Sequence, residues 1–157
     1  MSSVKGLNNI LKNLNKEGRN IEDDIYVGIN NALILGQRDA KMNAPVGQTG
    51  ELREKIFVHM QKQNNKIQGC LYGTAGHHPY VEFGTGPTGN GTYPYTIKGY
   101  TLKYKANKWK VKIPFLVSEN DSGIRYIAGQ VAQPHMYPAF LLVENNLIKE
   151  IKKANRR

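Results

Sequence analysis

The stretch PYVEFGTG, Pro79 to Gly86, decides the fold that we expect for this chain. A proline favours an extended residue before it, and three of the four residues that follow Pro79 have high strand propensity. Gly84 and Gly86 can adopt backbone angles that other residues avoid, so a bulge or a sharp turn should follow. The stretch therefore predicts one strand that ends in a turn. Gly84, like Gly50 earlier in the chain, is expected to hold a special backbone angle and not to contact a ligand.

Upstream of this stretch, apolar residues recur at helical spacing. They predict one helix over Ser3–Lys16, closed by Gly18, and a second over Asn20–Met42, which Pro45 stops. A turn at Thr49-Gly50 follows. Either Thr49 caps a short helical turn after it, or a strand begins already at Leu52.

Alternating residues predict an antiparallel hairpin over Lys55–Tyr72 with its turn at Asn64-Asn65. Further strands are expected over residues 95–105 and from Lys108 until Pro114, then a loop over 119–123. A short strand or an irregular segment is expected over 125–131.

A final helix is predicted over Leu141–Ala154, with Pro138 in the first turn. Its apolar residues Leu147, Ile148 and Ile151 should be buried, either in the protein itself or by a neighbouring subunit. The fold class is therefore α+β: two N-terminal helices, an antiparallel sheet with an inserted hairpin region, and a C-terminal helix packed on the sheet.

The composition indicates a single globular domain over residues 1–157. The chain has 157 residues and a formal net charge of +10, from 22 basic and 12 acidic residues. Such a balance attracts polyanions, although scattered lysines are also typical of an ordinary solvated surface. We expect synthesis in the cytoplasm, because the sequence begins without the apolar run of an export signal.

A search for chemistry in the sequence predicts no catalytic residue, no metal site and no cofactor. His77 and His78 lie near Glu82, but neighbouring residues of a strand point to opposite faces and would rarely share an ion. They are better interpreted as a pair at a loop tip or strand edge. The single cysteine, Cys70, is expected to be a small buried residue.

The segment from Tyr93 to Lys110 interleaves aromatic residues with lysines, a pattern that can bind single-stranded nucleic acid. The alternative is a two-stranded hairpin with its aromatic residues turned inward or paired and its lysines in solvent. The pattern consists of Tyr93, Tyr95, Tyr100, Tyr104 and Trp109 with Lys98, Lys103, Lys105, Lys108 and Lys110.

Three segments in order, APVGQTGELREKI (44–56), HHPYVEFGTG (77–86) and QPHMYPAF (133–140), together resemble the small neck proteins of long-tailed bacteriophages, known as head–tail joining or tail-completion proteins. The residues that carry the resemblance are Pro45, Thr49, Gly50, Leu52, Arg53, Tyr80, Glu82, Phe83, Gly84, Thr85, Pro134, Pro138 and Ala139. Val81 departs from the commoner alanine of the family. The segment 86–133 is a long, family-variable β insert on which the resemblance says nothing.

The resemblance implies a structural virion protein without enzymatic activity, located at the neck or tail end. Its partners would be further copies of itself in a ring, the head-connector and tail proteins, and DNA passing through the ring. The charged motif residues Arg53 and Glu82 would then orient loops or subunit contacts through charge-assisted hydrogen bonds, or be merely solvated. The alternative function is a basic nucleic-acid-binding protein that uses residues 93–110.

Overall fold

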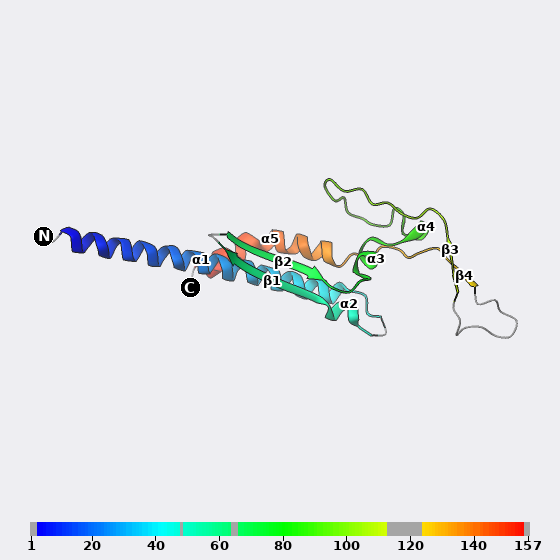
Figure 1. Cartoon of the computed structure of the whole chain (residues 1–157), viewed down its shortest axis with the longest axis horizontal. Coiled ribbons are helices and arrows are strands. Elements are labelled where there is room, and N and C mark those ends of the chain that lie inside the picture. The colour runs from blue at the N-terminus through cyan, green and yellow to red at the C-terminus, as the bar shows by residue number, and fades with distance from the viewer. Residues whose placement is uncertain (1–2, 48, 64–65, 113–123, 156–157) are drawn as a thin grey trace. The chain divides into compact units, whose positions relative to one another are not determined.

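The computed structural model describes residues 3–47, 49–63, 66–112 and 124–155 (Figure 1). The chain divides into two compact units, which are described separately. Unit 1 comprises Met1–Asp39, Phe57–Tyr72 and Ala139–Arg157, and unit 2 comprises Ala40–Ile56 and Gly73–Pro138. The single-domain boundary stays a prediction. Among the described residues, none of the helices has the length and apolar character needed to cross a membrane.

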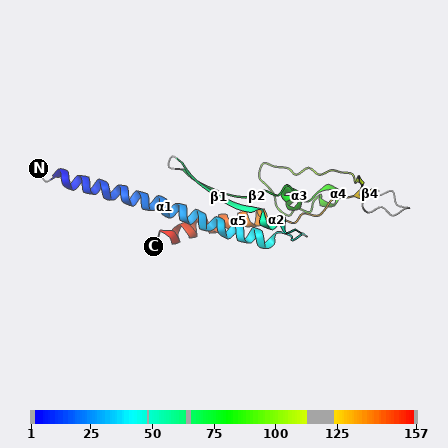
Figure 2. The same cartoon turned by 60° about the horizontal axis from the view of Figure 1, so that its bottom comes forward.

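The α+β class predicted from the sequence is confirmed. The helices are α1 (Ser3–Asn43), α2 (Glu51–Glu54), α3 (His78–Phe83), α4 (Gly86–Gly89) and α5 (Met136–Ala154). The strands form two separate pairs, β1 (Ile56–Gln63) with β2 (Lys66–Gly73) and β3 (Trp109–Lys112) with β4 (Ile124–Ile127). Figure 2 shows the same elements from a second direction.

In unit 1, α1 packs against both the β1–β2 hairpin and α5, and glycines allow the close approach. A side chain at Gly36 would overlap Val143 of α5, and one at Gly69 of β2 would overlap Leu33 of α1. Leu33 is only 6% exposed, as expected at such a contact. The C-terminal helix therefore packs in the strand region, as predicted.

The two predicted N-terminal helices are one continuous helix, α1, so the predicted break at Gly18 is wrong. A glycine within a helix costs only about 1 kcal/mol relative to alanine. A Cβ added at Gly18 would have no atom within 4 Å, so no neighbouring segment packs closely enough to force a turn there. The good helix formers on both sides of Gly18 therefore continue the helix.

The stretch that we expected to be a strand is also a helix, α3, over His78–Phe83. Pro79 fits the first turn of a helix as well as it fits a strand edge, so it did not distinguish the two. The expected turn is present. Gly84, with φ 76°, ends α3, and Gly86, with φ 61°, also has positive φ. The special backbone angles predicted for these glycines, and for Gly50 with φ 66°, are confirmed, while the absence of a ligand contact stays a prediction.

The predicted strand over residues 95–105 is absent, because its aromatic residues pack in a cluster instead of pairing in a sheet. The rings of Tyr93 and Tyr95 lie 5.6 Å apart, and Tyr95 lies 4.8 Å from Tyr137. Gly99 then turns the chain with φ 78°. The inward-facing two-stranded hairpin proposed for this segment is therefore also wrong.

The next predicted strand, from Lys108 until Pro114, is present over Trp109–Lys112, and Ile113 lies outside the described residues together with the loop over 119–123. It pairs antiparallel with β4, from Trp109 opposite Ile127 to Lys112 opposite Ile124. Of the two interpretations of residues 125–131, a short strand is observed at the beginning of that range.

The β1–β2 hairpin is confirmed, and its turn at 64–65 lies outside the described residues. Of the two alternatives after Thr49, the helical turn α2 is the observed one. Cys70 is exposed, contrary to prediction. Its neighbour Gly69 faces α1, and successive residues of a strand point to opposite faces, so Cys70 lies on the uncovered face.

Candidate functional site

Glu82 is the centre of the motif region in unit 2. It is 5% exposed, and its carboxylate accepts hydrogen bonds from the first backbone amides of α5. The amide nitrogens of His135, Met136 and Tyr137 lie 2.8, 2.9 and 3.0 Å from its oxygens. Helix N-termini leave backbone donors without intrahelical partners, and negative charge is stabilising there. Glu82 therefore caps α5 from a distant part of the sequence.

The same carboxylate begins a buried chain of polar groups that continues through two histidines. Glu82 Oε2 lies 3.2 Å from His135 Nδ1, and His135 Nε2 lies 3.0 Å from His78 Nδ1. His135 Nδ1 is also 3.2 Å from the carbonyl of Gln133. His135 and His78 are 0% and 5% exposed. The predicted loop-tip or strand-edge pair is therefore wrong for His78, which α3 turns into the interior.

The outer nitrogen of His78, Nε2, is buried and lacks a hydrogen-bond partner among the described residues. Burial lowers the pKa of His78 below its ordinary value of 6.5, and the neighbouring His135 lowers it further, while the nearby carbonyl of Lys55 opposes the shift. A side chain at Gly73 would overlap the imidazole ring. The imidazole is therefore enclosed and disfavours a positive charge.

Arg53, the other charged motif residue, lies at the C-terminal end of a helix, whereas Glu82 lies at an N-terminal end. Its guanidinium donates to the carbonyls of Met42 and Ala44, at 3.5 and 3.3 Å. These carbonyls belong to the last residues of α1 and the turn after it, where acceptors lack intrahelical partners. Arg53 and Glu82 therefore each hold a helix end, and no hydrogen bond or ion pair of the described residues joins them directly.

The backbone after α3 is clamped to the segment before α5. Thr85 N donates to the Gln130 carbonyl at 2.9 Å, and Gln130 N donates back to the Thr85 carbonyl at 3.1 Å. Gln130 Nε2 also donates to the carbonyl of Tyr80 at 2.9 Å. A Cβ at Gly84 would come within 2.8 Å of Ala132 N, so only glycine fits this crossing.

The structure brings the first two motifs together at a small pocket of about 210 Å³. Pro45, Thr49 and Leu52 come from the first motif, and Val81 comes from the second. Gln133 supplies the beginning of the third. Leu52 is 4% exposed, and the hydroxyl of Thr49 accepts a long hydrogen bond of 3.4 Å from Glu51 N. The convergence of these segments was not predictable from their spacing.

The other motif residues have separate positions. Phe83 packs edge-on against Tyr93, with ring centres 5.1 Å apart, while Tyr80 is 60% exposed. Pro134 precedes α5 and Pro138 lies in its first turn, both half-buried. Ala139 is fully buried in unit 1, where its carbonyl lies 3.1 Å from the Cβ position of Gly36.

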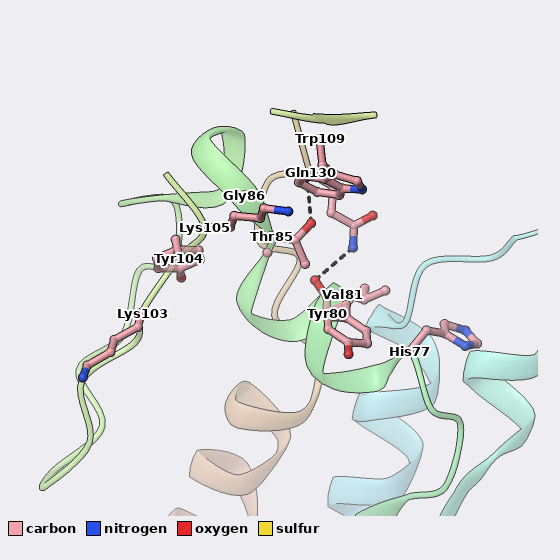
Figure 3. Close-up of a pocket in the computed structure, with 11 residues that line it drawn as sticks. His77, Tyr80, Val81, Thr85, Gly86, Lys103, Tyr104, Lys105, Trp109 and Gln130 are labelled. Carbon is pink, nitrogen blue, oxygen red and sulfur yellow. Dashed lines mark hydrogen bonds between the residues drawn. The ribbon is translucent and has the colours of Figure 1, made fainter. Parts of the chain in front are cut away.

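A larger pocket of about 630 Å³ lies beside α3, within unit 2, and shares His77, Val81 and Gln130 with the smaller one (Figure 3). Its lining residues come from three segments: His77, Tyr80, Val81, Gly84, Thr85 and Gly86; Lys103, Tyr104, Lys105 and Trp109; and Gln130. The Tyr104 hydroxyl donates to the carbonyl of Phe83 at 2.8 Å. This bond ties the lysine-rich segment to the motif helix.

The described residues hold no group of three or more histidine, cysteine or acidic side chains that could bind a metal ion. Sequence reasoning missed His135 and Gln130, which complete the buried chain and the clamp. The proline that precedes His135 was noted only as part of a motif. The sequence did contain one signal for His135. Gln133 and His135 are polar residues immediately before an amphipathic helix, where the free backbone amides of the helix need hydrogen-bond partners.

Comparison with known proteins finds no matching family model, no matching curated protein and no matching solved structure. The resemblance to phage neck proteins therefore rests on the three sequence motifs alone.

Proposed function

We propose that this chain is a structural protein of the neck of a long-tailed bacteriophage, which assembles with copies of itself and joins the head to the tail. The observation that carries the proposal is that the charged motif side chains and the clamp residues form hydrogen bonds within the fold. Glu82 and Arg53 are engaged by the ends of α5 and α1, and Gly84 and Thr85 by a backbone clamp. Structural roles of this kind are what a protein that acts by assembly requires of its motif residues.

A protein that acts by assembly needs surfaces that another copy can cover, and unit 1 presents two. On α1, Val27 and Ile34 are 40% and 48% exposed, and their spacing of seven residues places them on one face. On α5, Phe140 and Ile148 are 55% and 61% exposed, two turns apart. Ile148 was predicted to be buried by the protein or by a neighbour, and within the chain itself it is exposed.

Each patch has exposed charges of both signs beside it, with Asp23 one turn from Val27 and Lys152 one turn from Ile148. Exposed Arg38 lies one turn from Ile34, and exposed Glu144 lies between Phe140 and Ile148. A contact between the α1 patch of one copy and the α5 patch of the next would bury apolar side chains and bring Arg38 and Glu144 together. Such a contact joins different surfaces, so it propagates from copy to copy and forms a ring if the rotation closes.

Light scattering after size exclusion tests self-assembly. Ile34→Asp and Ile148→Asp should each abolish the oligomer, whereas Ile124→Asp, at a similarly exposed position of unit 2, should not. A mixture of the two defective variants should give dimers, because each retains one intact surface. A wild-type protein that stays monomeric alone and with its head and tail partners would refute assembly, and absence of mixed dimers would refute the head-to-tail pairing.

Electron microscopy of lysates tests the place of action. In a phage that lacks this protein, DNA-filled heads and finished tails should accumulate without joining, because packaging and tail assembly precede the joining step. Heads that remain empty, or joined infectious particles, would contradict the neck assignment. The exposed-patch variants should reproduce the joining defect, and Ile124→Asp should not.

A further inference from the structure

We propose that the 630 Å³ pocket beside α3 binds one nucleotide of a single-stranded nucleic acid, its base among the aromatic side chains and its phosphates at Lys105 and Lys103. This inference stands independently of the neck assignment. The sequence had suggested single-strand binding by residues 93–110 as a whole, and the structure narrows it to one site built from that segment and α3.

The pocket combines the two kinds of group that bind unpaired strands, which are aromatic faces and cations. Tyr80, Tyr104 and Trp109 line it, and Tyr80 is 60% exposed, so its ring is accessible to a base. A volume of about 630 Å³ is in the range of small-ligand pockets, roughly 300–1,000 Å³. The described lining residues include two lysines and no aspartate or glutamate, so the site favours an anion.

Among the described residues, Lys105 contacts an aromatic ring and forms no ion pair with an acid. Its Nζ lies 5.2 Å from the ring centre of Trp109, a cation–π contact. Trp109 packs against Gly86, where a Cβ would lie 2.8 Å from its ring. An ammonium held over a ring without a carboxylate partner can accept a phosphate while keeping its contact with the ring.

Lys103 suits the next phosphate along the strand. Figure 3 shows its amino group pointing away from the other labelled side chains, at the rim of the pocket. The flanking segment, residues 93–112, contains no acidic residue and six lysines: Lys98, Lys103, Lys105, Lys108, Lys110 and Lys112. A backbone that leaves the pocket therefore meets positive charge, whereas an acidic peptide would gain the charges but leave the aromatic rings without a base to stack on.

Trp109 is the only tryptophan of the chain, so its fluorescence reports on this pocket alone. Titration of the full-length protein with octathymidylate should quench that fluorescence saturably. Lys103→Ala/Lys105→Ala should weaken binding and reduce the slope of log affinity against log salt by about 0.7 for each phosphate that is no longer neutralised. The matched control, Lys66→Ala/Lys149→Ala, removes the same charge from exposed positions outside both the pocket and the lysine-rich segment, and should change affinity little.

Tyr80→Ala should weaken binding of octathymidylate roughly 5- to 150-fold, the usual range for removal of one stacking partner. Tyr80→Phe keeps the ring and should bind normally. Because Tyr80 is largely exposed, both variants should fold, and circular dichroism melting checks this. Octauridylate in place of octathymidylate distinguishes RNA from DNA as the natural strand.

Three ligands make the proposal refutable. Thymidine monophosphate binding as tightly as the octamer would mean a free nucleotide, a DNA duplex binding equally well would mean general attraction to phosphate, and octaglutamate quenching equally would mean an acidic peptide. Each result would overturn the proposal, as would the absence of quenching by either octamer or an equal loss of affinity in the Lys66/Lys149 control. Loss of affinity confined to the pocket variants supports it.

Discussion

Replacing Glu82 by alanine should be among the most damaging single substitutions in this chain. The change removes the acceptor for three backbone amides, at 2.8–3.0 Å, and leaves them at a site where the carboxylate was 5% exposed. A hydrogen bond to a charged group contributes about 1.5–3 kcal/mol, so three summed independently would give roughly 4.5–9 kcal/mol.

Two effects reduce that sum. Burying the carboxylate itself costs free energy, a cost that is absent in the variant, and water can enter the space that the side chain leaves. An ordinary exposed N-cap contributes only about 0.5–2 kcal/mol, which sets the lower limit. For this buried cap we expect a loss of about 3–5 kcal/mol in the free energy of unfolding, the range typical when one partner of a buried charged contact is removed.

Guanidinium chloride denaturation followed by circular dichroism measures the effect. A loss of this size should lower the midpoint by about 1 M, for a slope of roughly 4 kcal/mol per M. Glu82→Gln keeps one carbonyl acceptor and should lose about half as much, while Glu54→Ala removes an exposed carboxylate and should lose little. If Glu82→Ala stayed within about 1 kcal/mol of the wild type, the capping argument would be refuted.

Four further predictions concern stability. Gly84→Ala should cost about 1–3 kcal/mol for its φ of 76° and ψ of 173°, a conformation nearly confined to glycine, and more for the overlap with the backbone, whereas Gly50→Ala, in the αL region with open space around it, should cost only about 1–2 kcal/mol; equal losses would argue against the overlap. The free energy of unfolding should fall as the pH drops below 6.5, because His78 in the unfolded chain then binds a proton that the buried His78 disfavours. Urea titrations at about pH 7.5 and 5.5 measure the difference in the free energy of unfolding between the two pH values, which should be smaller for His78→Gln than for the wild type. The same difference in both proteins would exclude His78 as the source. Arg53→Ala should cost about 0.5–1.5 kcal/mol in urea denaturation, since its two hydrogen bonds are long and the residue is exposed, and a loss above about 3 kcal/mol would mean an additional role. Truncation at Val143 should lower stability by several kcal/mol because packing on α1 is removed, and an unchanged melting temperature would refute that packing.

The elements that sequence reasoning predicted correctly are those whose pattern is local. The alternation over 56–73 depends only on which face meets a helix, and the periodicity of α5 depends only on its own apolar residues. The positive φ at Gly84 followed from glycine itself. These features could be derived because no distant residue was needed to decide them.

The errors arose where a distant contact outweighed local propensity. Tyr80 and Val81 favour a strand, yet α3 forms, since a helix places both His78 and Glu82 in the interior against residues 135–137. Tyr95 likewise favours a strand but packs on Tyr137. The candidate pocket could not be predicted as a site for the same reason, because it needs Gln130 beside α3.

The pairing of β3 with β4 makes the length of the chain between Lys112 and Ile124 almost a free variable. With both of these residues held in paired strands, lengthening the chain between them costs only closure entropy, about 0.6 kcal/mol for each doubling. Segments of different length and sequence can therefore be exchanged between these two residues at small cost, while the contacts of residues 95–104 with α3 and with the start of α5 are kept.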